Sequence, residues 1–231
     1  MDAERKLWNE QQKVLRHAPF SGEDYPAARQ LFFQQHAMLH RAEMAGAGLW
    51  SYEDEVWAGL SEDQARCIPS GSEHSIAWVI WHITRIEDVT MNMLVAGGAQ
   101  VMLGGSWHEH MGVTASHTGN AMTAQAVAQL SETINLEALR AYRLLVGRQT
   151  RAVVQRLSAT ELTQHVTPAR LQQLVREGAV LPAAQEVLDY WGELNIAGLL
   201  LMPPTRHSFI HLNEAMKLRQ LLVKGQRSLA R

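Results

Sequence analysis

Apolar residues recur three or four positions apart along almost the whole chain, and few stretches alternate as a half-buried strand does. This period predicts an all-α fold. Residues that favour helix starts, such as Asn135 and Pro182, precede several of the apolar stripes. We expect four long amphipathic helices, at about 25–49, 72–96, 135–157 and from Thr205 onward, with an extra helix at 182–201. Four long helices without an internal repeat predict a four-helix bundle.

The segments between these helices predict further organisation within a single domain over residues 1–231. Residues 97–120 are rich in glycine and have no sustained period, so we expect a long connection there, and long connections are often functional. Residues 160–202 are longer than a simple turn and are interpreted as an insertion before the last long helix. Residues 1–20 predict a helical extension that docks on the bundle or on a partner.

Composition places the chain among ordinary globular proteins, with 46% hydrophobic and 19% charged residues. A net charge of −2 offers no basic field for a phosphate backbone, so we expect no nucleic-acid partner. The single cysteine, Cys67, cannot form an internal disulfide, and the N-terminal residues lack the apolar core of a signal peptide. The most apolar run, residues 196–202, is too short to cross a bilayer. We therefore expect a cytoplasmic protein with a small-molecule substrate and no membrane association, which could form a homodimer.

Among 11 histidines, two on the last long helix give the sharpest chemical signal. His207 and His211 are four positions apart and therefore share one helix face. Because the same stripe continues with apolar residues, both imidazoles are expected to face the bundle interior. Such pairs also occur by chance, so a metal site needs a third ligand.

His82 is the candidate for that third ligand, because it shares a helix face with Val79 and Ile86. A buried imidazole without a partner would cost roughly 1–3 kcal/mol. The ordinary solution is a hydrogen bond to a carbonyl or carboxylate in the core. The alternative is that His82, His207 and His211 converge on one ion and leave a coordination position open, as in catalytic zinc sites.

The segments HSIAWVIWHITRIEDVTMNML and PPTRHSFIHLNEAMKLR, which contain these histidines, resemble the DinB-like superfamily. The resemblance implies an up-down-down-up bundle with a long crossover between the second and third helices, which residues 97–120 would supply. It also implies a divalent metal held by His82, His207 and His211. Similar proteins include S-transferases and isomerases that use bacillithiol, mycothiol or glutathione. The long segment 160–202 and the HLNEA run, in place of an HxGQ-like ending, depart from commoner members, so no particular thiol follows.

Three functions fit these features. The leading one is a metal-dependent transferase of a low-molecular-weight thiol, with zinc or nickel as the expected ion and iron as an alternative. The second is a non-enzymatic metal- or ligand-binding bundle in a stress response, in which the ion is structural. The third is an ion-free scaffold with an interaction surface. No HExxH, paired ExxH or GxSxG motif is present, so the sequence gives no support for a zinc protease, a ferritin-like di-iron protein or a serine hydrolase.

Other residues have both a functional and a structural interpretation. His36 and His40 would supply a fourth ligand or a supporting contact, although a partly exposed helix face is the more common origin of such a pair. Glu214 could orient His211, and Glu87 or Asp88 could orient a histidine of another helix. The remaining candidates are Trp78 and Trp81, as core or pocket wall, and His108, His110 and His117, as a cover over the site or a solvated loop.

Overall fold

The computed structural model describes residues 2–18, 24–44 and 50–229, with side chains up to residue 223. Within these residues the regular structure is helical, and the only β-type pairing is an isolated bridge between His165 and Asn195. The predicted all-α fold is therefore confirmed. The up-down-down-up order of the helices stays a prediction.

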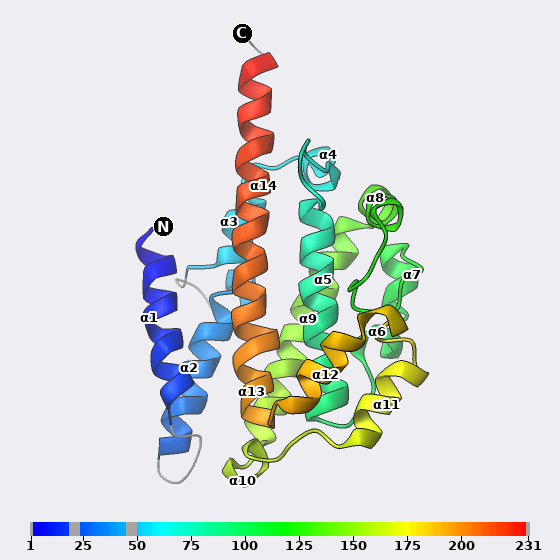
Figure 1. Cartoon of the computed structure of the whole chain (residues 1–231). Coiled ribbons are helices and arrows are strands. Elements are labelled where there is room, and N and C mark those ends of the chain that lie inside the picture. Colours follow the sequence, from blue (N-terminus) through cyan, green and yellow to red (C-terminus); the bar gives the residue numbers. More distant parts are fainter. Residues whose placement is uncertain (1, 19–23, 45–49, 230–231) are drawn as a thin grey trace.

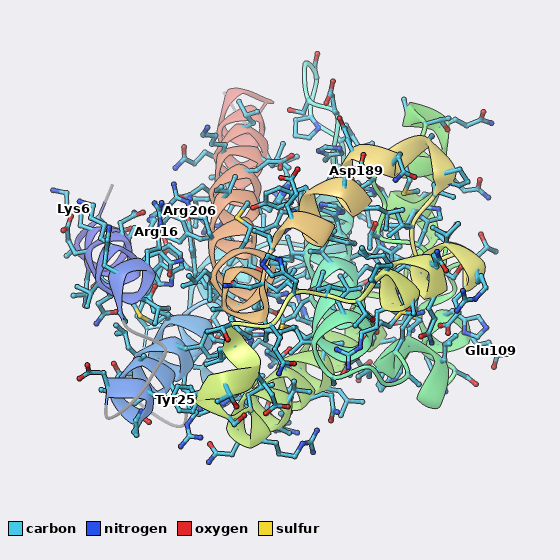
Figure 2. All side chains as sticks on the ribbon, turned by 60° about the horizontal axis from the view of Figure 1, so that its bottom comes forward. Lys6, Arg16, Tyr25, Glu109, Asp189 and Arg206 are labelled. Carbon is cyan, nitrogen blue, oxygen red and sulfur yellow. The ribbon has the colours of Figure 1, made fainter. Side chains whose placement is uncertain are left out.

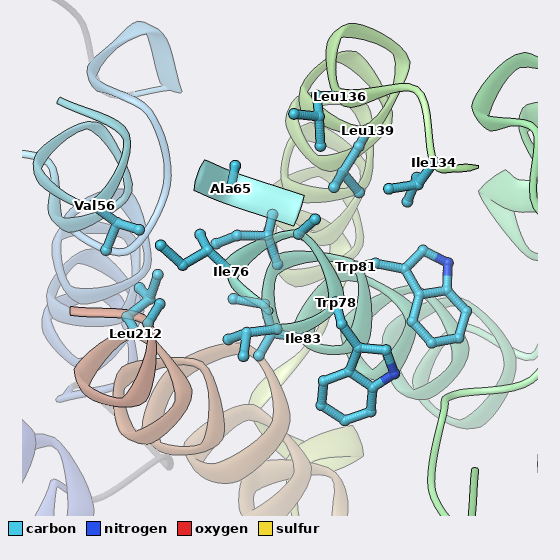
Figure 3. Packing of buried hydrophobic residues seen from close by; sticks show 14 of the residues in the cluster. Val56, Ala65, Ile76, Trp78, Trp81, Ile83, Ile134, Leu136, Leu139 and Leu212 are labelled. Atoms are coloured by element: carbon cyan, nitrogen blue, oxygen red, sulfur yellow. The ribbon is translucent and has the colours of Figure 1, made fainter. Parts of the chain in front are cut away.

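Four long helices form the body of the molecule (Figure 1). They are α2 (Tyr25–Ala37), α5 (Ile76–Asp88), α9 (Leu136–Arg156) and α14 (Ser208–Leu229). Helix α5 packs against both α9 and α14, and every one of its residues is buried. Figure 3 shows its side chains, including Ile76 and Ile83, between Leu139 on one side and Leu212 on the other. The element that carries His82 is therefore the centre of the core.

The remaining elements, among them α1 with 15 residues, pack around these four helices. They are α1 (Ala3–His17), a 3-10 turn (Ala42–Met44), α3 (Tyr52–Trp57), α4 (Glu62–Arg66), α6 (Val101–Gly104), α7 (Trp107–Met111), α8 (Ala124–Thr133), α10 (Ala159–Leu162), α11 (Pro168–Arg176), a 3-10 turn (Pro182–Ala184), α12 (Gln185–Glu193) and α13 (Ile196–Leu201). Charged side chains such as Lys6, Arg16 and Glu109 lie on the outside of the molecule (Figure 2). None of the helices described is long and apolar enough to span a membrane.

The first long helix is shorter than predicted. It ends at Ala37, and the chain then turns instead of continuing to residue 49; residues 45–49 lie outside the described part. The carbonyl groups that a longer helix would use are bonded elsewhere: the N–H of Tyr52 donates to Met38 O (2.9 Å), and the hydroxyl of Ser51 donates to His40 O (2.6 Å). The start of α3 therefore caps the end of α2.

The predicted long connection at 97–120 is also partly helical, because it contains α6 and α7. The buried carboxylate of Asp88 accepts hydrogen bonds from the N–H groups of Val101 (2.8 Å) and Met102 (3.0 Å), at the first turn of α6. A residue thirteen positions away along the chain thus satisfies the free N–H groups of a four-residue helix. No local sequence pattern predicts that contact.

The helix predicted at 182–201 is two helices, α12 and α13, with a break at Leu194. From α13 the chain runs through a π-helical segment, Met202–His207, into α14, so Thr205 does not cap a new helix. Pro203 and Pro204 cannot donate to the preceding carbonyls. The Thr205 hydroxyl instead donates to Leu200 O (3.1 Å), which keeps the helical path continuous.

Candidate metal centre

The three histidines that the family resemblance selects, His82, His207 and His211, lie close together, although more than a hundred residues separate the first from the other two along the chain. His82 belongs to α5, His207 ends the π-helical segment, and His211 is one turn into α14. Ring centroids are 5.2 Å apart for His82 and His207, 4.9 Å for His82 and His211, and 4.5 Å for His207 and His211. One ligand atom from each side chain lies within 4.8 Å of the others, as one bound ion requires.

His82 is fixed as a neutral ring that presents Nε2. Its Nδ1 lies 2.6 Å from the carbonyl oxygen of Thr118, which only accepts, so Nδ1 carries the proton. Burial, with a smaller effect of His211, lowers the pKa of His82 to about 3. A neutral ring with Nδ1–H leaves a lone pair on Nε2, which is the form that binds metal.

His211 is oriented by Glu214, as the sequence suggested. The Nδ1 atom of His211 lies 2.7 Å from one Glu214 oxygen, and the Nδ1 of His74 lies 2.7 Å from the other. Burial would raise the pKa of Glu214, but the hydrogen bonds from the two histidines outweigh it and lower the pKa to about 2. The carboxylate therefore stays ionised and holds the Nδ1–H of His211, which leaves Nε2 for a ligand.

His207 has a different environment. Its Nδ1 is buried and has no hydrogen-bond partner in the described residues. Burial, followed by the proximity of His82 and His211, holds the pKa of His207 well below its usual value. A neutral imidazole with a buried nitrogen that has no hydrogen-bond partner can offer a lone pair to a metal ion, and binding the ion would satisfy the ring. The residues present thus fit a divalent metal.

Sequence reasoning missed His74, because it precedes α5 and acts through Glu214, which is 140 positions away along the chain. Its ring stacks on Trp78 at 3.8 Å, and Trp78 in turn stacks on His82 at 4.8 Å, with interplanar angles of 5° and 8°. The spacing of four residues in 74, 78 and 82 was the available signal for this column. Trp78 and Trp81 both belong to the core cluster, as their structural interpretation expected.

A cavity of about 320 Å³ opens beside His207. Its walls come mainly from α12 and the π-helical segment, and neither Trp78 nor Trp81 is among them. The lining residues are Ile86, Asn120, Glu186, Val187, Tyr190, Trp191, Met202, Pro203 and His207. The predicted insertion 160–202 thus supplies most of this mostly apolar pocket, whose size suits a small molecule.

The end of the 97–120 segment packs against His82 and also contributes Asn120 to the pocket. Gly119 has φ +92°, and a Cβ there would lie 2.7 Å from Trp81 Cζ3 and 3.2 Å from His82 Nδ1. Its N–H donates to Nδ1 of His117 (3.0 Å), whose pKa is lowered by burial and by Arg85. His108 and His110 lie on α7, and His110 is exposed, which agrees with a solvated position.

His36 and His40 do not join this group. They contact Glu87 instead, with Nε2 of His36 2.8 Å from Oε1 and Nε2 of His40 3.1 Å from Oε2. Glu87 therefore does orient histidines of another element, as the sequence suggested. The partly exposed helix face was the wrong interpretation, because both histidines are buried.

Comparison with known proteins gives one family. A family model described as DinB superfamily matches residues 48–197, which include His82 and the pocket-lining α12. His207 and His211 lie beyond the matched range. A comparison with curated proteins found no match.

Proposed function

The chain belongs to the DinB superfamily, and from that premise we propose that it is a metal-dependent transferase of a low-molecular-weight thiol. In this proposal His82, His207 and His211 hold one divalent ion, zinc, nickel or iron. The acceptor is a small electrophile bound in the adjoining cavity of about 320 Å³.

The observation that carries the proposal is three histidines meeting beside a pocket, without a fourth donor. Among the described residues, no further histidine, cysteine or carboxylate belongs to this group. Structural zinc sites are usually closed by four protein ligands, whereas catalytic sites keep one position for water or substrate. His207 and His211 are also partly exposed, so a small molecule can reach the site. These features favour turnover over a purely structural ion.

The chain's own residues prepare the site for thiol chemistry. Thr118 and Glu214 hold the Nδ1 protons of His82 and His211, so both rings present Nε2 to the same point. When bound, a divalent ion lowers the pKa of a coordinated thiol and polarises a carbonyl. The apolar side chains of Val187, Trp191 and Met202 shield the acceptor from water.

The transfer itself balances without an oxidant or reductant. The thiol loses its proton to solvent, its sulfur forms a bond to the electrophilic carbon, and the leaving group departs with the electron pair of the broken bond. An isomerase that adds and then eliminates the thiol would use the same first step.

The test compares chelated and metal-reloaded protein, purified without a metal-affinity tag. Glutathione, bacillithiol, mycothiol and coenzyme A are each offered with a chromogenic aryl halide between about pH 6 and 9, a range that spans histidine deprotonation. We expect metal-dependent product with at least one thiol. If no thiol gives a metal-dependent product, the transferase proposal is contradicted and the non-enzymatic binding function is favoured.

His207→Ala is the informative variant, and His110→Ala is its matched control, because His110 is exposed on α7. We expect His207→Ala to lose the ion of this site and the product while keeping its helical circular dichroism, since apolar packing supplies most of the stability. His110→Ala should keep both. Loss of helicity together with the ion would indicate a structural ion.

A further inference from the structure

We propose that His36, His40 and Glu87 form a second divalent-cation site inside the bundle, independent of the first site and of the proposed transferase activity. The three residues come from α2, from the turn after it and from α5. One ligand atom of each lies within 4.8 Å of the others. Two imidazole nitrogens and a carboxylate oxygen are a donor set that suits zinc and related transition-metal ions.

The cluster is buried throughout: His36 is 0%, His40 1% and Glu87 0% exposed. Burial, followed by the charge of Arg143, lowers the pKa of His40 to about 3, so this ring is an uncharged donor. Burial opposes ionisation of Glu87, but contacts with both histidines outweigh it and hold the Glu87 pKa well below its usual value. The hydroxyl of Thr150, on α9, also donates to Glu87 (2.7 Å). The carboxylate is therefore ionised in the core.

Among the described residues only His36 and His40 pair with this carboxylate, and they balance its charge only when protonated; no lysine or arginine forms an ion pair with it. The two buried arginines nearby are paired with other acids: Arg85 with Asp88 at 2.9 Å and Arg143 with Glu53 at 2.7 Å. A buried charge without a counter-charge is costly, since buried ions are normally paired or bound to metal. A cation between the two imidazoles and Glu87 supplies that counter-charge.

The histidine rings can accept such an ion without losing other contacts. In the hydrogen-bonded form each Nε2–H points to Glu87, and the Nδ1 atoms of both rings are buried without a partner in the described residues. If each proton moves to Nδ1, coordination of the ion by the two Nε2 lone pairs and by Glu87 replaces the two hydrogen bonds to Glu87, and no hydrogen bond at Nδ1 is lost because neither Nδ1 has a partner in the described residues.

The chain also makes room for this arrangement. An added Cβ at Gly147 of α9 would lie 2.8 Å from His40 Cε1 and 2.9 Å from His40 Nδ1. A glycine inside a helix costs up to about 1 kcal/mol relative to alanine. Here it lets the His40 ring reach Glu87. The contacts to α2 and α9 place this cluster on a different side of α5 from His82, which faces α14.

The test counts transition metals per chain in tag-free, full-length protein from zinc-supplemented cultures, by mass spectrometry after desalting. We expect two zinc ions in the wild type, one in His207→Ala and one in Glu87→Gln. The double variant should hold none. Glu137→Gln, an exposed carboxylate on α9, is the matched control and should keep both ions.

The variants separate this proposal from the transferase. If His207→Ala retains one ion and the double variant retains none, the second site is supported whatever the activity assays show. A His207→Ala protein that is folded but metal-free overturns it, and so does Glu87→Gln with the wild-type metal content; the three residues would then be a hydrogen-bonded network only. Because His207→Ala leaves the second cluster intact, this result decides the question even if Glu87→Gln fails to fold.

The rate of loss to a chelator gives an independent readout. The first site is partly exposed and the second is not. In the wild type we expect EDTA to remove one ion quickly and the other only on the timescale of local unfolding. Loss of all bound zinc in one fast phase would contradict a buried site.

Discussion

His82 and His40 are both neutral because burial disfavours the imidazolium form, and each has a pKa of about 3. In the unfolded chain a histidine titrates near pH 6.5. The unfolded state therefore binds more protons than the folded state at any pH between about 3 and 6.5. The stability that these histidines contribute is complete above pH 6.5 and is lost as the pH falls toward 3.

For the chelated protein we predict that the free energy of unfolding falls between pH 6 and 5 by about 1.4 kcal/mol per pH unit for each of these two histidines. Urea denaturation at several pH values measures the slope. His82→Gln should reduce it by about one histidine's share, whereas His110→Gln, at an exposed position, should leave it unchanged. A slope that is the same in His82→Gln as in the wild type would contradict a neutral, buried His82.

The candidate ligands could be named from the sequence because helical spacing and the family resemblance both selected His82, His207 and His211. The residues that support them were less accessible. Glu214 lies one turn from His211, so local spacing revealed it. Thr118 acts through a backbone carbonyl, which no side-chain pattern reports. His36 and His40 were recognised as a pair, but which helix they face depends on how α2 docks.

Gly119 shows how one connecting segment supports the site. Its positive φ disfavours other residues, and an added Cβ there would lie 2.7 Å from Trp81 and 3.2 Å from His82. Gly71 also has a positive φ, +77°, but an added Cβ there would meet nothing within 4 Å. Alanine substitutions at the two glycines therefore distinguish the cost of backbone strain from the cost of a steric clash.

We predict that Gly71→Ala destabilises the protein by about 1 kcal/mol through backbone strain alone. Gly119→Ala should cost about 1–3 kcal/mol more, because the new methyl group displaces the segment from Trp81. It should also weaken metal binding at His82, since the Thr118 carbonyl moves with it. Thermal melts and zinc titrations measure both effects; equal losses in the two variants would show that the contact with Trp81 does not matter.

Helix prediction succeeded where local signals decide the structure. The helix predicted at 135–157 is α9, and the Asn135 side chain accepts from the N–H of Ala138 (3.0 Å), as an N-cap does. It failed at the end of α13, where the side chain of Gln12 on α1 donates to Leu201 O (3.2 Å), a contact that no local pattern contains. Consecutive prolines normally end a helix, yet Pro203 and Pro204 lie inside a π-helical segment that joins α13 to α14.

The N-terminal helix α1 is part of the folded body, although the family match begins only at residue 48. Trp8 is 0% exposed, and its ring stacks on Phe209 of α14 with centroids 4.0 Å apart. Its indole N–H donates to Gln35 O of α2 (3.1 Å). The predicted helical extension therefore packs on α2 and on α14, the helix that carries His211.

We predict that Trp8→Ala destabilises the protein by about 3–5 kcal/mol, the usual cost of removing a buried aromatic ring. Leu7→Ala, one position earlier and 52% exposed, is the control and should change the stability by less than about 0.5 kcal/mol. Urea unfolding followed by circular dichroism measures both. Similar small losses in the two variants would mean that α1 contributes little to the stability of the protein.

The all-α class followed from the apolar period, since helical packing needs an apolar stripe on each long helix. The order and directions of the helices were implied by the resemblance and do not follow from the period. The pocket beside His207 was also beyond the sequence, because it forms only when α12 folds back along the π-helical segment.

Polar contacts from other elements fix helix α5 on two sides, one at His82 and one at Glu87. His82 and Glu87 are five residues apart, which is about 7.5 Å along the helix and about 140° around it. The Thr118 carbonyl holds the first, while His36, His40 and Thr150 hold the second. Rotation of α5 about its axis would break one set of contacts as soon as it improved the other. Any adjustment of the site to a bound molecule therefore falls to the opposite wall, where His207 and Pro203 lie on the π-helical segment.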